Sequence, residues 1–298
     1  MYSPTQPTMP QKSFVTPTRL MTGKDLPSGL RLNTLAGWNQ TAADWRGFLE
    51  NSPAGCFVAE LDGQIVGTAA TIIYENRFAW IGMVLVDPEF RNRGIGTQLL
   101  HKAIEHLDHL GIATMKLDAT PLGKPIYLKL GFVPEYEIER WTLKRPAPVE
   151  PAQPVWCPNL EHAQIARICE FDRELFGADR SYLLQSLDRR APELTNIAWK
   201  DDRPHAYSFG RKGLFADHLG PCAAMDPKIA EQLLRSFLER SARETLIVDC
   251  LLSHSAFLDS LRAAGFVSSR PLTRMFRGPN SHPGRPESIC TILGPEFG

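Results

Sequence analysis

The segment Val84-Leu85-Val86-Asp87-Pro88-Glu89-Phe90-Arg91-Asn92-Arg93-Gly94-Ile95-Gly96-Thr97-Gln98-Leu99-Leu100 begins as an apolar strand and ends with the apolar spacing of an amphipathic helix. Two glycines in the turn between them allow the backbone to approach a ligand closely. The first N–H groups of a helix have no partner inside it, and the helix dipole adds partial positive charge there. The turn is therefore predicted to bind phosphate or pyrophosphate, with the charges of Arg91 and Arg93 beside it.

Two other phosphate-binding motifs fit this turn less well. A dinucleotide fingerprint requires Gly or Ala where Leu99 stands, and a Walker A loop requires Gly-Lys-Ser/Thr. The spacing Arg-x-x-Gly-x-Gly over residues 91–96 resembles instead the acyl-CoA signature of the GNAT N-acetyltransferase superfamily. On this motif alone, the alternative that the turn only connects a strand to a helix stays open.

A second segment resembles the same superfamily. After a predicted strand over residues 114–120, Pro125-Ile126-Tyr127-Leu128-Lys129-Leu130-Gly131-Phe132 predicts a short helix that ends in Gly-Phe. In the family, a tyrosine at the position of Tyr127 protonates the departing sulfur of CoA. A phenol of pKa ~10 can protonate a thiolate whose conjugate acid has a pKa of roughly 8.5. The alternative is that Tyr127 only packs in the core.

The resemblance implies acetyl-CoA as co-substrate and assigns residues to it. The main chain of residues 92–97 would wrap the pyrophosphate, and the strand before the turn would pair with pantetheine. One N–H of that strand, assigned to Leu85, would act as the oxyanion donor, a contribution on the order of 3 kcal/mol. The implied binding set is Val84, Leu85, Val86, Arg91, Asn92, Arg93, Gly94, Ile95, Gly96 and Thr97.

The sequence leaves the general base open among Glu75, Asp118, Glu135 and Glu137. Asp118 is favoured because it ends a strand beside the expected cleft. Its alternative role is to cap the turn over residues 120–123. We therefore take Tyr127 and Asp118, with the Leu85 main chain, as the predicted catalytic set.

Three tryptophans, Trp38, Trp45 and Trp80, are candidates for the acceptor side of the cleft. Aromatic residues in such strands and helices also serve commonly as core residues, so both interpretations stay open.

The composition is that of a globular protein of 298 residues, long enough for two domains. Lys plus Arg equals Asp plus Glu at 33 each, so we expect neither nucleic acid nor membrane as partner. No apolar run approaches the ~18 residues of a membrane span. The scattered cysteines favour reduced thiols in the cytoplasm, and the histidines lack metal-ligand spacing, so no metal is expected. The cysteines are Cys56, Cys157, Cys169, Cys222, Cys250 and Cys290, and the histidines considered as metal ligands are His205, His218 and His254.

A proline-rich stretch over residues 145–154 divides the chain near its middle. This stretch predicts a linker over residues 146–154, between a first domain over 13–145 and a second domain over 155–298. The N-terminal residues 1–12, with Pro4, Pro7 and Pro10, are predicted to be a flexible tail. In the first domain the pattern predicts helices over 26–35 and 42–49. It predicts strands over 55–61, 64–74 and 77–86, with a hairpin turn at Asp62-Gly63.

The second half repeats part of the first at an offset of 134 residues. Gln-Leu-Leu stands 34 residues before the Phe of Gly-Phe in both halves, at Gln98 and at Gln232. Asp-Pro precedes Gln-Leu-Leu in both halves, but nine residues separate the two motifs in the first half and four in the second. Leu261 stands where the first half has Tyr127. The second unit is therefore predicted to lack the phosphate turn and the proton donor.

A group of charged residues in the second half, Asp172, Asp179 and Arg180, has two interpretations. The group selects a charged acceptor across the cleft, or it caps a helix and forms a surface ion pair.

The element order predicts an α/β (α+β) fold. The resemblance to the GNAT superfamily implies two GNAT-like domains in tandem, each a mixed, mostly antiparallel, splayed sheet flanked by helices. It also implies acetyl transfer from acetyl-CoA to a primary amine of a small molecule by direct attack, in a monomer or homodimer. The alternative is an acyl-CoA sensor or interaction module without turnover. An enzyme is favoured because a sensor needs no proton donor.

Overall fold

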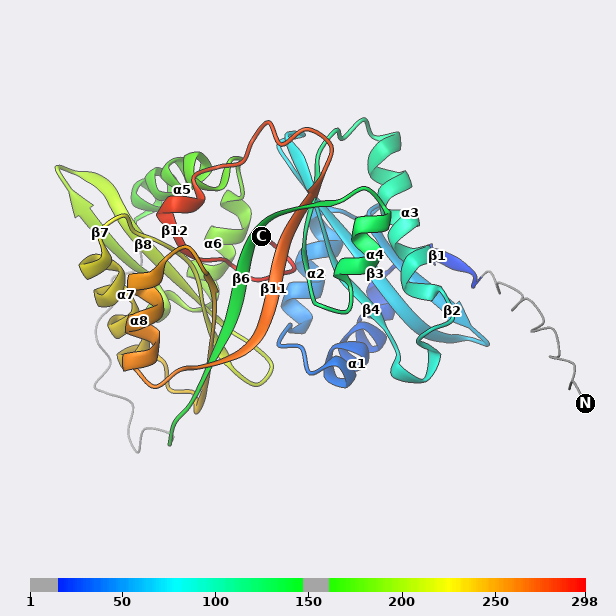
Figure 1. Ribbon diagram of the computed structural model, residues 1–298, viewed down its shortest axis with the longest axis horizontal. Helices are drawn as coiled ribbons and strands as arrows, with labels where there is room; N and C mark the ends of the chain where they lie inside the picture. Colours follow the sequence, from blue (N-terminus) through cyan, green and yellow to red (C-terminus); the bar gives the residue numbers. More distant parts are fainter. Residues whose placement is uncertain (1–15, 147–160) are drawn as a thin grey trace, which may run out of the picture.

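The computed structural model describes residues 16–146 and 161–298. The predicted tail, most of the predicted linker and Cys157 lie outside the described residues. Within them, twelve strands form one continuous sheet in the order β1-β2-β3-β4-β5-β11-β6-β10-β12-β9-β8-β7 (Figure 1). The fold is therefore α+β, with a mixed and mostly antiparallel sheet.

The first half contains β1 (Thr18–Leu20), α1 (Leu26–Ala36), α2 (Ala42–Asn51), β2 (Cys56–Leu61), β3 (Gln64–Tyr74), β4 (Phe78–Val86), α3 (Ile95–His109), β5 (Met115–Ala119), α4 (Lys124–Lys129) and β6 (Val133–Lys144). The second contains α5 (His162–Phe176), α6 (Ser181–Arg190), β7 (Asn196–Lys200), β8 (Arg203–Lys212), β9 (Asp217–Ala223), α7 (Pro227–Arg240), β10 (Thr245–Leu251), α8 (Ser255–Ala263), β11 (Val267–Arg277) and β12 (Ile289–Thr291). None of the helices in these two ranges is long and apolar enough to cross a membrane.

Two tight turns produce the β2-β3-β4 meander. Asp62 and Gly63 have φ of 48° and 77°, and Glu75 and Asn76 have φ of 50° and 54°. Two successive positive φ values are typical of the type I′ turn, whose twist matches that of paired strands. The alternation of side chains then buries one face of the meander with α1 and α2, and the other with α3.

The sheet opens between β4 and β5. These parallel strands pair only at Ala79–Met115 and Trp80–Lys116. Beyond Trp80, β4 keeps β3 as a neighbour, and within residues 16–146 and 161–298 no strand pairs with it on its β5 side. The main chain of residues 81–86 therefore faces a gap in the sheet, and the gap leads directly to the turn before α3.

The last long strand of each half pairs with the other half. β11 pairs with β5 of the first half, and β6 pairs with β10 of the second. The two exchanged strands also pair with each other, from Val267–Thr142 to Phe276–Val133. Both run through the middle of the molecule between the two groups of helices (Figure 1). A cut at the predicted linker would thus divide the chain but not the sheet.

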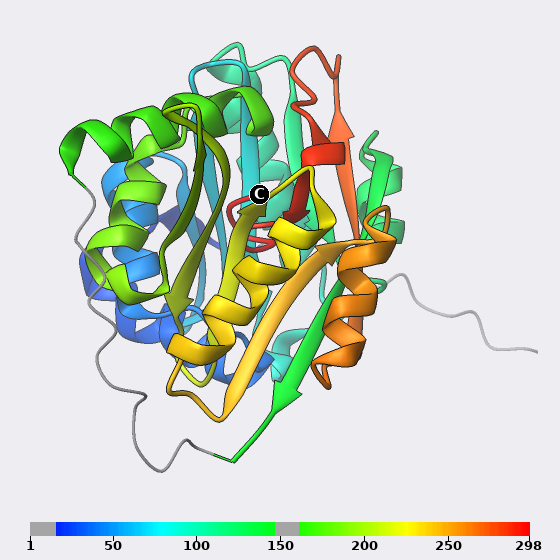
Figure 2. The ribbon, with the colours of Figure 1, turned by 90° about the vertical axis from the view of Figure 1, so that its left-hand side faces the viewer.

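The second half is closed where the first half is open. Three residues connect β9 to α7, whereas eight connect β4 to α3, so the long phosphate turn is missing. β12 inserts between β9 and β10 and fills the gap there. A Cβ added at Gly220 would collide with the main-chain oxygen of Ile292, so the inserted segment lies in close contact with β9. Figure 2 views the molecule from this half.

Candidate functional site

The turn between β4 and α3 is held by its own polar groups. The Asp87 carboxylate accepts a hydrogen bond from the Glu89 N–H at 3.1 Å and pairs with Arg31 at 2.5 Å. Asn92 and Gly94 have φ of 61° and 81°. Glycine adopts this left-handed conformation without the cost that a side chain brings, and Gly94 is the N-cap residue that directly precedes α3.

The N-terminus of α3 offers free donors. The first main-chain bond into the helix runs from the Gln98 N–H to the Gly94 carbonyl at 3.0 Å. In the described part of the chain, the N–H groups of residues 95–97 have no main-chain acceptor. Arg91 and Arg93 are exposed beside them, anchored to the main-chain oxygens of Val86 and Glu89. These groups together fit an anion such as pyrophosphate.

β4 carries an irregularity next to the gap. Met83 has a φ of 54°, and the pairing with β3 shifts between Thr68–Leu85 and Ala70–Gly82. The Thr68 hydroxyl donates to the Met83 carbonyl at 2.8 Å. This bulge interrupts the regular ladder between β3 and β4 next to the gap.

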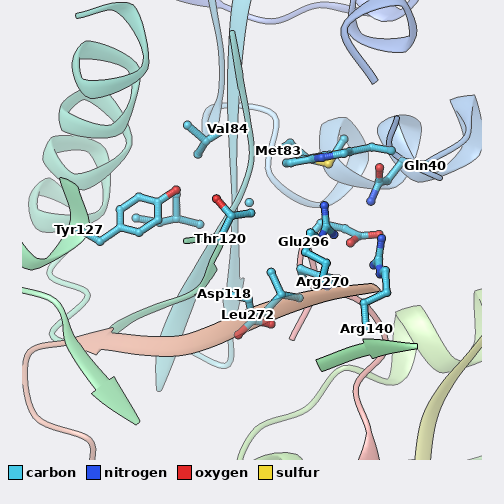
Figure 3. Close-up of a pocket in the computed structure, with 14 residues that line it drawn as sticks. Gln40, Met83, Val84, Asp118, Thr120, Tyr127, Arg140, Arg270, Leu272 and Glu296 are labelled. Atoms are coloured by element: carbon cyan, nitrogen blue, oxygen red, sulfur yellow. The ribbon is translucent and has the colours of Figure 1, made fainter. Parts of the chain in front are cut away.

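A cavity lies at this gap, between the two halves of the molecule, and encloses about 590 Å³, part of it open to solvent (Figure 3). Its lining comes from β4, β5, α4, β6 and β11, with the segments at residues 38–40 and 295–296 closing it. The lining residues are Trp38, Gln40, Ile81, Gly82, Met83, Val84, Asp118, Thr120, Tyr127, Arg140, Arg270, Leu272, Pro295 and Glu296.

Tyr127 lies at one end of the cavity, with its hydroxyl pointing toward the Thr120 side (Figure 3). Its ring packs edge-on to Phe132 at 6.1 Å between centroids, and a Cβ at Gly123 would lie 2.8 Å from the ring. Burial raises the pKa of the Tyr127 phenol to about 12, so it keeps its proton at neutral pH. It is placed to donate that proton into the cavity.

Asp118 lines the cavity but is bound to an arginine. Arg274 of β11 donates two hydrogen bonds to its carboxylate, both at 2.9 Å. Arg274 is itself packed over the Trp80 ring at 4.5 Å and donates to the Tyr136 hydroxyl. Burial raises the pKa of Asp118, and the guanidinium opposes that shift. The structure thus gives the predicted base a buried ion pair rather than a free carboxylate.

The other predicted bases lie outside the cavity lining. Glu75 pairs with Arg173 at 2.7 Å, and that guanidinium lowers its pKa. Glu135 pairs with Lys116 and Glu137 with Lys124, both at 3.2 Å. Each of the three carboxylates is therefore used in an ion pair away from the cavity.

Of the three tryptophans that were candidates for the acceptor side of the cleft, one lines the cavity and two are core residues. Trp38 lines the cavity, whereas Trp45 and Trp80 are buried in the core. The Trp80 indole N–H donates to the Pro295 carbonyl at 2.9 Å. This bond attaches the segment that closes the cavity to the strand that opens it.

The charged group of the second half lies away from the cavity. Arg180 and Asp172 form an ion pair at 2.8 Å with both side chains about 1% exposed, so the pair is buried and not on the surface. Asp179 accepts from the Ser181 N–H at 2.8 Å, as a cap of α6. Their capping and pairing role is confirmed, and the predicted surface location of the pair is wrong.

The histidines and cysteines have structural neighbours. His218 lies 3.3 Å from Asp249, and burial lowers its pKa, so the imidazole is neutral. Across residues 16–146 and 161–298, no three His, Cys, Asp or Glu side chains are grouped to hold a metal ion. The described cysteines are free and buried: Cys56, Cys169, Cys222, Cys250 and Cys290.

Four polar residues of the cavity were not predicted from the sequence: Gln40, Arg140, Arg270 and Glu296. Two of them stand on the exchanged strands, and Glu296 lies more than 150 residues from any residue of the predicted site. No local pattern marks these residues. The pairing of β6 with β11 brings Arg140 and Arg270 to the gap, and the segments at residues 38–40 and 295–296 bring Gln40 and Glu296.

Comparisons with known proteins agree with this geometry. The model of the acetyltransferase (GNAT) family matches residues 30–132, and a second model, acetyltransferase (GNAT) domain, matches residues 168–290. The first match includes the phosphate turn and Tyr127. The second covers the half whose gap β12 fills.

Similar proteins extend over most of the chain. Holothin acyltransferase from a Pseudoalteromonas species is 23% identical over 88% of this chain and 87% of its own length. Mycothiol acetyltransferase from Acidimicrobium ferrooxidans is 31% identical over 42% of this chain and 46% of its own. A crystal structure from Pyrococcus horikoshii, of a protein proposed to be an acetyltransferase, covers both chains fully with a TM-score of 0.77 and 22% identity.

Proposed function

Because this chain belongs to the GNAT acetyltransferase family and carries two GNAT domains in tandem, we propose that its first domain moves an acetyl group from acetyl-CoA to a primary amine of a small molecule. The observation that carries the proposal is that the turn before α3 leads into the gap between β4 and β5, and that the phenol of Tyr127 lines the cavity at this gap. Holothin acyltransferase and mycothiol acetyltransferase, by their names, acylate small molecules, which supports an acceptor of that size.

Different groups of the chain bind different parts of acetyl-CoA. The N–H groups at the start of α3 hold the pyrophosphate, and Arg91 and Arg93 add charge at its edge. The free edge of β4 aligns the extended arm of the co-substrate along residues 84–86. An N–H on the gap side of this edge stabilises negative charge on the carbonyl oxygen during attack. The N–H of Leu85, the predicted donor, faces β3 instead, because Leu85 pairs with Thr68 and the Asp87 N–H, two residues further on, donates to the Val66 carbonyl.

Two proton movements remain, and the cavity wall offers a group for each. Tyr127 donates to the departing sulfur. Among the carboxylates of the wall, both oxygens of Asp118 accept hydrogen bonds from Arg274, whereas Glu296 pairs with Arg211 through Oε1 at 2.7 Å. Glu296 Oε2 has no hydrogen-bond partner in the described residues, so we assign the ammonium of the acceptor and its proton to Glu296.

Release of free thiol from acetyl-CoA over a panel of primary amines tests the proposal. Thiol release with at least one amine supports an enzyme. Binding of CoA in calorimetry without release for any amine favours a sensor, and absence of binding favours an interaction protein.

The double variant Arg91→Gln/Arg93→Gln is expected to raise the KM for acetyl-CoA about tenfold at low salt, with little change in kcat. Both side chains are exposed, so the difference from the wild type should shrink as salt rises. Steady-state kinetics at two ionic strengths measure it. The control is Arg235→Gln, an exposed arginine of α7. A KM equal to that of the control at low salt contradicts the assignment of these arginines.

A further inference from the structure

The end of the cavity opposite Tyr127 is rich in polar groups. Figure 3 shows Tyr127 on one side, and Gln40, Arg140, Arg270 and Glu296 gathered on the other. Of this end, the proposed reaction uses only Glu296, beside Tyr127 and the β4 edge. Gln40, Arg140 and Arg270 are therefore left for the remainder of an acceptor molecule.

The arginines around this cavity differ in one respect. Three of them have carboxylate partners: Arg140 pairs with Asp249 at 2.7 Å, Arg274 with Asp118 at 2.9 Å, and Arg211 with Glu296 at 2.7 Å. Arg270 forms no ion pair and no side-chain hydrogen bond with any residue in 16–146 or 161–298. Arg211 also lies 3.5 Å from Asp44, so among the described residues Arg270 is the arginine of this group that has no direct carboxylate partner.

The position of Arg270 in the sheet explains why it is unpaired. It stands on β11 directly opposite Arg140 of β6, beside a bulge between Ser268 and Arg270. Arg140 donates to the nearby carboxylate of Asp249 through its Nε and one Nη, both at 2.7 Å. Burial, together with the charge of Arg140, lowers the pKa of Arg270 to about 10, so it remains a cation at neutral pH.

A half-buried cation without a partner costs stability unless a ligand neutralises it. Here the Nε of Arg270 is fully buried and makes no hydrogen bond, although the residue itself is half-buried and lines the cavity. Gln40 Oε1 and Glu296 Oε2 are also without hydrogen-bond partners in the described chain. A cation and two residues with unpaired acceptor oxygens thus line the same cavity, which suits a ligand with an anionic group and N–H groups.

We propose that the acceptor carries an anionic substituent, a carboxylate or a phosphate, and that the Arg270 guanidinium binds it while the amine end reaches the β4 edge. This inference rests on the proposed function, since it specifies the acceptor of that same site. The guanidinium offers two parallel donors to either anion. Specificity would then come from the second domain, which supplies Arg270 to the active site of the first.

The test compares amines that differ only in the anionic group. The probes are glycine, β-alanine, 4-aminobutanoate and the standard α-amino acids, each beside its primary amide, with 2-aminoethyl phosphate and 3-aminopropyl phosphate as the second arm. The kcat/KM for the best anionic probe is expected to exceed that of its neutral partner about 100-fold. The phosphate arm shows which anion the site accepts.

Arg270→Gln is expected to remove this preference, bringing anionic and neutral probes to within about threefold of each other, while Arg270→Lys keeps part of it. The KM for acetyl-CoA should change less than about threefold, because acetyl-CoA is assigned to the turn before α3 and Arg270 lies on β11. Arg235→Gln again serves as the matched control, with the wild-type preference intact.

The outcomes separate the two proposals. Equal use of anionic and neutral probes by the wild type, or a preference that survives in Arg270→Gln, overturns the role of Arg270 and leaves acetyl transfer in place. If no probe releases thiol, the proposed function is what fails. Calorimetry of the same probes on the CoA-bound protein then tests whether Arg270 binds the anionic group. Anionic probes must bind the wild type more tightly than their amides do, and they must lose that advantage in Arg270→Gln.

Discussion

Replacing Tyr127 by Phe is expected to lower kcat about 10²- to 10³-fold and to change the Kd of acetyl-CoA less than about threefold. The ring keeps its edge contact with Phe132, so packing is preserved and only the hydroxyl that enters the cavity is lost. Thiol-release kinetics and calorimetry with CoA measure the two quantities. Because the pKa of Tyr127 is raised to about 12, the wild-type rate should show no loss from its ionisation below about pH 10.

The control for this prediction is Tyr182→Phe. Tyr182 lies on α6, outside the cavity lining. Removal of its hydroxyl should leave kcat unchanged. A Tyr127→Phe protein that turns over like this control would exclude Tyr127 from the chemistry.

Replacing Arg274 by Met is expected to lower the free energy of unfolding by about 3–5 kcal/mol. Arg274 is 4% exposed and its partner Asp118 is 0% exposed, so the substitution leaves a buried carboxylate without its cation. The pair also joins β11 of the second half to β5 of the first. Urea unfolding, followed by circular dichroism, measures the change.

Two further variants test the cause. Arg274→Met/Asp118→Leu removes both charges and should recover much of the loss, because the desolvated carboxylate is gone. Arg235→Met breaks the exposed pair with Glu231 on α7 and should cost less than about 1 kcal/mol. If Arg274→Met unfolds at the same urea concentration as Arg235→Met, the buried pair does not stabilise the joined sheet.

The local elements of the first half were predictable because local rules fix them. The strands of the meander, the turn at Asp62-Gly63 and the start of α3 near Gly94 follow from alternation, turn chemistry and glycine. The missing turn of the second half also followed from sequence, through the five-residue difference between the two Asp-Pro repeats. The structure adds that β12 fills the gap there, which no spacing indicates.

The exchange of β6 and β11 could not be predicted, because the apolar pattern of a strand does not tell which neighbour it pairs with. For the same reason, Asp118 was correctly placed at the cleft, but Arg274, which binds it from 156 residues away, was not foreseen. Arg270 and Glu296 were missed as well. All of these contacts depend on long-range pairing that only the folded sheet establishes.

The exchanged strands have a consequence for the growing chain on the ribosome. When β5 has been synthesised, the edge that β11 will cover is still bare, and β6 has no β10 to pair with. Bare strand edges are templates for pairing with other polypeptides. The nascent first half must therefore wait, shielded, until Val267–Arg277 leaves the exit tunnel, and protection by a chaperone during that interval should govern the yield of correctly assembled protein.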